Sequence, residues 1–378
     1  MMNQPRRTAR HRAACGFSLV ELMVSLTLGL FIISGMLTLI ARNSDTRGEI
    51  EKAGRQIENG RYAVQRLTED IHHAGFFGEF YDLPAGTVLP TAATDVCSTD
   101  LAVLKTDMSF PIQAFTDAAT PPSCIDAADF VAGTSVLVLR FASPVLTLAE
   151  GWVTANIAAT LAPGVIYVQP YVEGVNFATR TSSPSAATLF ASSMVSGPAG
   201  ALVTAPIYRY ITRLYFISPC SRPASGQAHC TSAADNGAPI PTLKMVELGS
   251  NGTTGTPPLW SNGTAPAFST TPVAVAEGIE RLEFDYGIDT LPATQKDGAA
   301  DAYSRCAPCT VAQWQDVVSV RISLLARNAE RSNGYSDPKT YAMGLAGSAS
   351  APSGSLNFKR HLFQAVARLN NLSMRREQ

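Results

Sequence analysis

A single apolar run near the N-terminus constrains this chain more than any other feature. Residues 17–41 read FSLVELMVSLTLGLFIISGMLTLIA and contain one charged side chain, Glu21. As a helix rising about 1.5 Å per residue, this run spans roughly 37 Å, which exceeds the ~30 Å hydrocarbon core of a bilayer. The apolar region of an ordinary cleaved signal peptide is only about 7–15 residues long. The run therefore predicts a membrane-spanning helix.

The charges on either side of this run predict its orientation. No acid precedes it, whereas the bases that follow it are balanced by acids. Because cytoplasmic flanks are enriched in Lys and Arg, residues 1–16 are predicted to be cytoplasmic and the body exported. Removing this leader leaves 25 basic against 30 acidic residues. The body therefore lacks the excess of positive charge that is typical of a nucleic-acid-binding protein. The leader arginines are Arg6, Arg7, Arg10 and Arg12.

Glu21 is the residue in this run that needs a physical explanation. A carboxylate inside a membrane span costs on the order of 2.5–3.5 kcal/mol, and such residues usually have a specific partner. One interpretation is that Glu21 lies close enough to the headgroups to stay hydrated. The other is that it pairs with a positive group that also enters the membrane.

The residues around Glu21 favour the second interpretation. The stretch Gly16-Phe17-Ser18-Leu19-Val20-Glu21-Leu22 resembles the type IV prepilin cleavage motif. The resemblance implies that a prepilin peptidase cuts after Gly16 and methylates the new amine of Phe17. It also implies that Glu21 pairs with the N-terminal ammonium of a neighbouring subunit. Many major pilins have a proline where this chain has Thr38, which argues against a bulk-forming subunit.

An amphipathic stalk helix is expected over residues 42–75, ending near Gly75. Apolar and small residues recur there at heptad a and d spacing. Either this stripe forms a coiled-coil dimer, or its outer half packs on the chain's own head as pilin helices do, and we favour the second. The a positions are Ile50, Ile57, Val64 and Ile71, and the d positions are Ala53, Gly60, Leu67 and Ala74.

The remainder, residues 76–378, is expected to form a β-rich head. Its apolar residues alternate with period two, and no strand–helix–strand rhythm appears, so the sheet should be antiparallel. Long Ser/Thr/Gly/Pro-rich loops are expected at 178–200, 219–242, 249–272 and 345–356. The predicted strands are Leu101–Thr106, Ser135–Phe141, Gly164–Gln169, Ile207–Ser218, Thr242–Leu248, Gly278–Ile288 and Val317–Ala326.

Four segments of the head look like PilW-type minor pilins: residues 209–216, 275–289, 314–327 and 358–371. The resemblance implies an α+β fold in which a long N-terminal transmembrane and stalk helix packs on an antiparallel sheet. It implies a structural subunit that helps to prime a type IV pilus and sits at its tip, in motility, adhesion or DNA uptake. The implied partners are other minor pilins, the major pilin, the prepilin peptidase and the inner-membrane assembly platform.

Two other functions remain open on the sequence. Minor pseudopilins of type II secretion systems share this plan. A membrane-tethered adhesin that never enters a filament would also have an anchor and an exported head.

Six cysteines lie beyond the membrane run, an even number that fits disulfides in an oxidising compartment. Six cysteines allow 15 pairings, and pairing between nearest neighbours is our guess. Cys306 and Cys309 form a CxxC, for which a structural disulfide is favoured over a redox centre or half a zinc site. The six are Cys97, Cys124, Cys220, Cys230, Cys306 and Cys309.

The sequence gives no support for an enzyme. It contains no HExxH, GxSxG or P-loop spacing, so no catalytic residue and no cofactor are predicted. Asp289, Asp297 and Asp301 form a weak Ca²⁺ candidate. A solvated turn is favoured there, because the full EF-hand pattern is absent and Lys296 lies inside the loop.

Overall fold

The computed structural model describes residues 18–78, 94–152, 161–162, 164–171, 174–179, 190, 194–196, 200–248, 272–292 and 294–376. The leader, Gly16 and Phe17 lie outside these residues. The chain divides into two compact units, residues 1–52 and 53–378. Because the second unit includes the last third of the long helix, this part of the helix belongs to the head.

The long helix α1 covers Leu19–His73. It ends where expected, because Gly75 has a φ of +76°, a conformation that glycine adopts without steric cost. The side chain of Asn371 donates to the carbonyls of His72, His73 and Ala74 at 3.1, 3.4 and 3.2 Å. These contacts satisfy carbonyls that have no partner within the helix.

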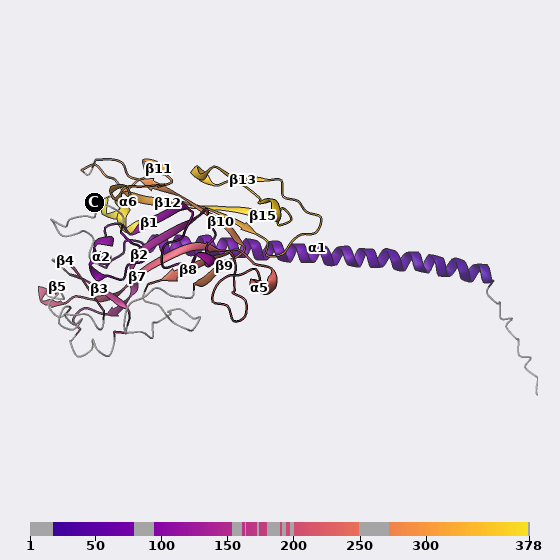
Figure 1. The fold of residues 1–378 in the computed structure, drawn as a ribbon, viewed down its shortest axis with the longest axis horizontal. Helices are drawn as coiled ribbons and strands as arrows, with labels where there is room; N and C mark the ends of the chain where they lie inside the picture. Colours follow the sequence, from indigo (N-terminus) through magenta and orange to yellow (C-terminus); the bar gives the residue numbers. More distant parts are fainter. Residues whose placement is uncertain are drawn as a thin grey trace, which may run out of the picture. The chain divides into compact units, whose positions relative to one another are not determined.

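The head contains two main sheets in which every strand pairing is antiparallel, which confirms the predicted α+β class (Figure 1). In sheet 1, one edge of β7 pairs with β2, while its other edge pairs with β3 and then β8. Sheet 1 consists of β1 (Ile112–Ala118), β2 (Thr134–Leu148), β3 (Ile166–Tyr171), β4 (Gly174–Thr179), β7 (Ile207–Ser218), β8 (Thr242–Glu247) and β9 (Val273–Glu277). Sheet 2, in the order β11-β10-β12-β15, consists of β11 (Ala302–Ser304), β10 (Ile279–Ile288), β12 (Val317–Arg327) and β15 (Arg360–Arg368).

Short elements complete the described part of the head. Two small hairpins pair β5 (Met194–Ser196) with β6 (Leu202–Thr204), and β13 (Thr340–Ala342) with β14 (Ser348–Ser350). The short helices are α2 (Leu101–Asp107), α5 (Ala234–Gly237), α6 (Val311–Gln315) and α7 (Asn370–Arg376), with 3-10 turns η1 (Ala127–Asp129), η4 (Gly344–Ala346) and η5 (Ser353–Ser355).

Six of the seven predicted strands are present, and the prediction of a strand at Leu101–Thr106 is wrong. This segment is helix α2, because the side chain of Asp100 accepts a hydrogen bond from the backbone of Ala102 and caps the helix. Leu104 is buried against the outer face of sheet 1. A short apolar run fits either a buried strand or a buried helix, so only the cap and the packing distinguish them.

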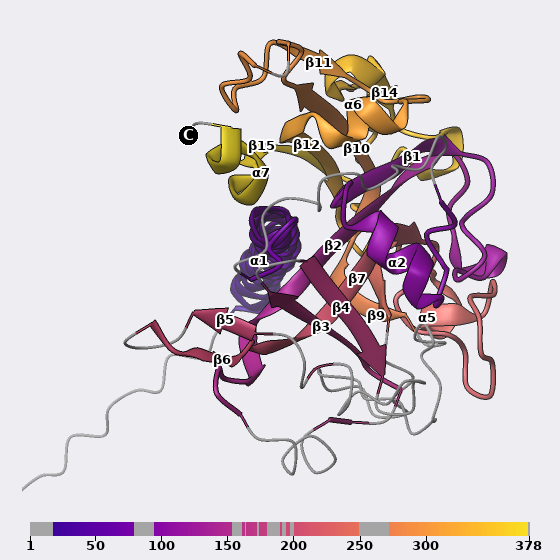
Figure 2. The ribbon, with the colours of Figure 1, turned by 90° about the vertical axis from the view of Figure 1, so that its left-hand side faces the viewer.

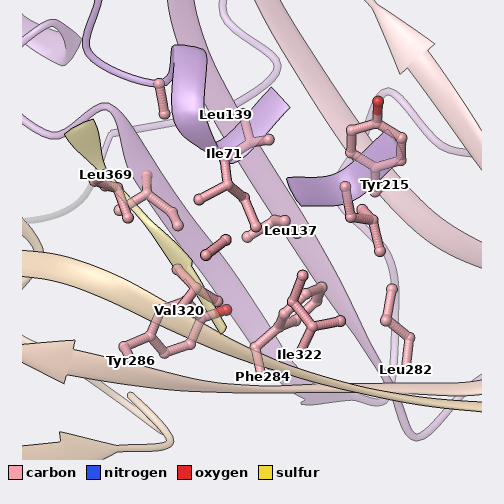
Figure 3. Packing of buried hydrophobic residues seen from close by; sticks show 14 of the residues in the cluster. Ile71, Leu137, Leu139, Tyr215, Leu282, Phe284, Tyr286, Val320, Ile322 and Leu369 are labelled. Atoms are coloured by element: carbon pink, nitrogen blue, oxygen red, sulfur yellow. The ribbon is translucent and has the colours of Figure 1, made fainter. Parts of the chain in front are cut away.

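The main core lies between the two sheets, with the head portion of α1 inserted along it (Figure 2). Ala63, Leu67 and Ile71 of α1 are fully buried there. Figure 3 shows Ile71 among residues from both sheets, including Leu137 and Leu139 of β2 and Phe284 and Ile322 of sheet 2. Full burial stabilises each large side chain by about 1.5–3 kcal/mol, so the helix holds the two sheets together.

The predicted packing of the outer half of the heptad stripe on the head is confirmed. Gly60, Leu67 and Ala74 are buried, as is Ile71, but Ile57 is 47% exposed. The stripe is therefore buried along its outer half, as predicted, and Ile57 lies before that half begins. A straight helix has 3.6 residues per turn, so a seven-residue row rotates by about 20° per heptad and turns away from the head.

Gly278 connects the two sheets between β9 and β10. Its φ is +78°, and its carbonyl accepts a hydrogen bond from the backbone of Arg327 at 2.7 Å. A Cβ at this position would lie 2.5 Å from the carbonyl oxygen of Arg327. The crossing between the two sheets therefore requires glycine at position 278, because any side chain there would clash with the backbone of Arg327.

We expect Gly278→Ala to lower the free energy of unfolding by at least about 2 kcal/mol, through left-handed strain and this backbone clash. Gly334→Ala is the matched control, because Gly334 has a φ of +70° but nothing within 4 Å of its Cβ position. It should cost only about 1 kcal/mol. Urea unfolding of the chain in detergent measures both values, and equal losses would contradict the proposed clash.

Candidate functional site

The membrane segment of α1 presents its side chains outward, as an anchor requires. An 18-residue window of this helix has a mean hydropathy of 2.2, and none of it is buried within the structure. Three of its hydroxyl groups donate to carbonyls of the helix itself: Ser25 Oγ donates to the Glu21 carbonyl at 2.6 Å, and Thr27 Oγ1 to the Val24 carbonyl at 2.9 Å. Thr38 Oγ1 donates to the Gly35 carbonyl at 2.8 Å.

Glu21 differs from these polar residues. No described residue donates a hydrogen bond to its carboxylate or forms an ion pair with it, although the sequence places it five residues inside the apolar run. A carboxylate in hydrocarbon without a partner is costly. Its partner must therefore come from outside the described chain, or the group must remain hydrated.

At the head, α1 is fixed by two amide side chains. Gln56 Nε2 donates to the carbonyls of Ala326 and Lys359 at 2.8 and 3.1 Å. Asn59 Nδ2 donates to the carbonyl of Glu277 at 3.1 Å. Because these carbonyls lie at or beside the ends of sheet strands, the contacts determine where the helix leaves the head.

A buried ion network fixes α1 against sheet 1. Both carboxylate oxygens of Asp70 accept from Arg213 Nη1 at 2.9 Å, and Tyr215 donates a further hydrogen bond. Arg213 Nε also donates to Glu247 at 2.6 Å. Burial by itself lowers the pKa of Arg213, but the carboxylates of Glu247 and Asp70 outweigh burial and raise it. The network therefore holds a charged arginine inside the head.

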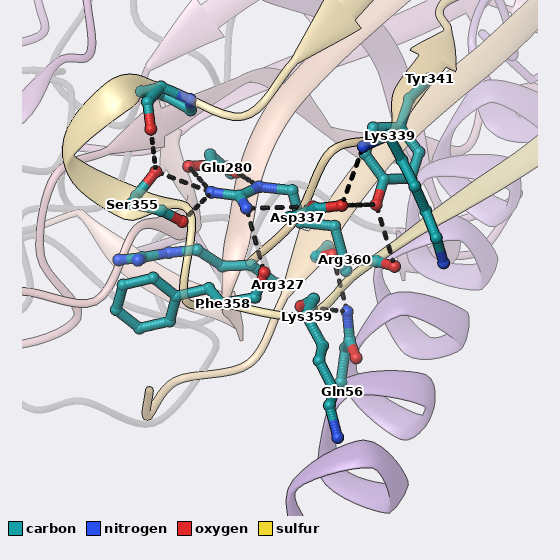
Figure 4. Close-up of polar contacts among 12 residues, drawn as sticks. Gln56, Glu280, Arg327, Asp337, Lys339, Tyr341, Ser355, Phe358, Lys359 and Arg360 are labelled. Atoms are coloured by element: carbon teal, nitrogen blue, oxygen red, sulfur yellow. Dashed lines mark hydrogen bonds and ion pairs between the residues drawn. The ribbon is translucent and has the colours of Figure 1, made fainter. Parts of the chain in front are cut away.

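A second buried cluster surrounds Arg360, at the start of β15 (Figure 4). Its side chain is buried, and it donates to Glu280 Oε2 at 2.6 Å and to Asp337 Oδ2 at 3.2 Å. It also donates to the carbonyls of Phe358 and Ser355 at 3.0 and 2.9 Å. Burial lowers the pKa of Arg360, but Glu280 and Asp337 outweigh it and raise the pKa. Arg360 thus fixes the segment that connects β12 to β15. This segment includes Lys359, whose carbonyl accepts a hydrogen bond from Gln56.

The six cysteines beyond the apolar run form three disulfides, Cys97–Cys124, Cys220–Cys230 and Cys306–Cys309. This is the nearest-neighbour pairing. All three lie in the head, where each bond closes a local loop. The CxxC cysteines are bonded to each other.

The structure uses the carboxylates of the weak Ca²⁺ candidate as turn-forming groups. Asp289 accepts from the backbone of Gly298 at 3.1 Å, Asp301 from Thr290 at 2.8 Å, and Asp297 from Ala299 at 2.9 Å. Nowhere in the described ranges do three or more His, Cys, Asp or Glu residues gather in a way that could hold a metal ion. The loop is organised by backbone amides.

Sequence reasoning missed the two ion networks. Asp70 immediately precedes Ile71 in the stalk stripe, and Arg360 lies in a Lys-Arg-His run that resembles a solvated surface. For the first network, the sequence did contain a signal: Asp70 is an acid on the side of the amphipathic helix that was predicted to be buried. No comparable signal exists for Arg360, since both of its carboxylates are distant in the sequence.

Comparison with known proteins gives one match at the N-terminus of the chain and one in the C-terminal part of the head. Residues 11–37 match the family model of the prokaryotic N-terminal methylation motif. Residues 236–371, which include β8, β9 and all of sheet 2, match the model of the type IV pilus-assembly protein W. No curated protein and no solved structure matched the chain. The two matches, together with a long apolar N-terminal helix and an antiparallel head, are consistent with a PilW-type type IV minor pilin.

Proposed function

We propose that this pilin helps to prime assembly of a type IV pilus and occupies the filament tip. The observation that carries the proposal is the combination of a methylation motif and a PilW-type head on one chain. One helix, α1, contains both the apolar membrane segment and the core residues Ala63, Leu67 and Ile71. The family consists of structural subunits, so the protein acts by binding to other subunits.

The proposed pathway begins with a single-pass precursor whose residues 1–16 are cytoplasmic and whose head is exported. The prepilin peptidase then cuts after Gly16 and methylates Phe17. The subunit leaves the bilayer laterally, and Glu21 pairs with the methylated ammonium group of a neighbour. Pairing is favourable because each isolated charge is costly in lipid and the two charges neutralise each other.

The proposed partners are other minor pilins, the major pilin and the inner-membrane assembly platform. The apolar membrane segment supplies contacts with neighbouring helices, and the head remains outside the membrane. Since the C-terminal match is to a pilus-assembly family, it favours a pilus over a secretion pseudopilus.

Mass spectrometry of the mature chain tests the processing step. From cells with an active prepilin peptidase, we expect a chain that begins at Phe17 and carries one added methyl group on its amine. The matched control is the same gene in cells that lack the peptidase, where the arginine-containing leader should remain. A native chain that retains its leader in peptidase-positive cells would exclude the proposed pathway.

A further inference from the structure

A buried lysine lies beneath one of the three disulfides. Lys244, at the centre of β8, is only 3% exposed. Its Nζ lies 4.0 Å from Cys220 Sγ and 3.9 Å from Cys230 Sγ. The hydroxyl of Ser218 is 3.3 Å from Cys230 Sγ. An amine and a hydroxyl are thus directed at the two sulfurs of one bond.

Lys244 forms no ion pair with a carboxylate in the described part of the chain. No carboxylate lies within ion-pair distance of its Nζ, and Asp129 and Asp235 act on it from farther away. Burial lowers the pKa of Lys244, while these two carboxylates partly oppose the shift. Burying a lysine is costly, and a disulfide is a poor partner for an ammonium group. A thiolate would be a much better partner.

We propose that Cys220–Cys230 is a thiol-exchange site in which Lys244 stabilises the leaving thiolate. Cys230 is partly exposed and Cys220 is fully buried, so an external thiolate attacks Cys230 Sγ. A mixed disulfide forms at Cys230 as the Cys220–Cys230 bond breaks. The electron pair stays on Cys220 Sγ, which is 4.0 Å from the ammonium group of Lys244.

The reaction is completed by a second external thiolate. It attacks the external sulfur of the mixed disulfide and leaves both cysteines reduced, so that two external thiols become one disulfide. In an oxidising compartment, the chemical class that supplies such thiolates is a dithiol oxidoreductase. The same steps in reverse restore the bond.

Opening this bond would change the loop locally without releasing it. The Cys230 amide donates to Asp129 Oδ1 at 2.8 Å, and His229 Nδ1 lies 2.9 Å from Asp129 Oδ2. On the other side, the Asp235 carboxylate accepts from the amides of Ser221 and Ile240, both at 2.9 Å. These contacts hold both ends of the loop when the disulfide is open.

The other two disulfides provide an internal comparison. The Cys97 sulfur accepts from the backbone amide of Cys124 at 3.0 Å. In the ranges that the structure describes, no lysine or arginine nitrogen contacts the sulfurs of Cys97–Cys124 or Cys306–Cys309. Among the described residues, only Lys244 places a cationic group at the sulfurs of a disulfide, that of Cys220–Cys230.

The test measures disulfide opening in the mature full-length chain in detergent. The chain is exposed to reduced glutathione at one pH, released thiols are trapped by alkylation, and the opening rate of each disulfide is read by peptide mass spectrometry. We expect Lys244→Met to slow the opening of Cys220–Cys230 by about three- to tenfold, because the leaving thiolate loses its counterion. Lys244→Arg should retain most of the wild-type rate, and the other two disulfides should open at unchanged rates. A wild-type rate for Cys220–Cys230 in Lys244→Met would overturn the proposal, as would an equal change in all three bonds.

A second measurement keeps the proposal testable if Lys244→Met folds poorly. In Cys230→Ser, Cys220 is the one free thiol of the mature chain, because Cys15 is removed with the leader and the other four cysteines are paired. Its ionisation can be followed by thiolate absorbance. We expect adding Lys244→Gln to raise the pKa of Cys220, and an unchanged pKa would refute the role of Lys244. Because neither measurement involves pilus assembly, their failure would leave the proposed function intact.

Discussion

Replacing Glu21 by alanine is expected to reduce incorporation of this subunit into filaments on the order of 100-fold. In the proposed assembly pair, the change leaves the ammonium group of a neighbouring subunit without a counterion in lipid. A charge there costs about 2.5–3.5 kcal/mol, and about 1.4 kcal/mol corresponds to a factor of ten in an equilibrium. The hydroxyl groups of Ser25, Thr27 and Thr38 carry no negative charge, so they cannot replace the carboxylate as a counterion.

Two variants make this experiment specific. Glu21→Gln keeps the size of the side chain and removes its charge, so it should fail as Glu21→Ala does. Glu51→Ala removes an exposed acid of the same helix beyond the apolar run, and it should assemble normally. The measurement compares the subunit in sheared filaments with the subunit left in membranes, by immunoblot, after N-terminal cleavage has been verified.

Normal incorporation of cleaved Glu21→Ala would rule out the assembly pair and would favour a tethered adhesin. If this subunit primes assembly, the same variant should also lower the number of pili per cell. Normal pilus numbers together with lost incorporation would separate membership in the filament from the proposed priming role.

Arg360→Met is expected to lower the free energy of unfolding of the head by about 3–5 kcal/mol. Breaking a buried ion cluster by removing one partner leaves the remaining charges uncompensated. In this case the carboxylates of Glu280 and Asp337 both lose the guanidinium group. Lysine has one ammonium group and cannot reproduce the fork of bonds that arginine makes, so Arg360→Lys should recover only part of the loss.

An exposed ion pair of the same head supplies the control. Arg55 Nη2 lies 3.5 Å from Glu330 Oε1, and more than half of each side chain is exposed. Because water screens such a pair, Arg55→Met should cost no more than about 1 kcal/mol. Urea unfolding of the chain in detergent, followed by tryptophan fluorescence, measures both variants. A loss at Arg360 no larger than the loss at Arg55 would show that the buried cluster contributes little to stability.

The features that depend on neighbouring residues were predictable from the sequence. The apolar run, the position of Glu21 within it and six of the predicted strands follow from local composition and periodicity. For the assembly segment, the sequence also supplied the motif residues Gly16 and Phe17, which lie outside the described residues. The even number of cysteines beyond the apolar run predicted disulfides, and the pairing itself was a guess that the structure reproduces.

Tertiary structure alone decided the features that depend on residues far apart in the chain. Asp70 lies within an ion network because Arg213 and Tyr215, about 145 positions away, meet it across the core. The same holds for Arg360 with Glu280, and for Lys244 beneath the Cys220–Cys230 bond. Segment 101–107 is a helix because Asp100 caps it and because Leu104 packs against sheet 1. Local periodicity specifies which face of an element is apolar, but only the packed neighbours determine which charges are buried together.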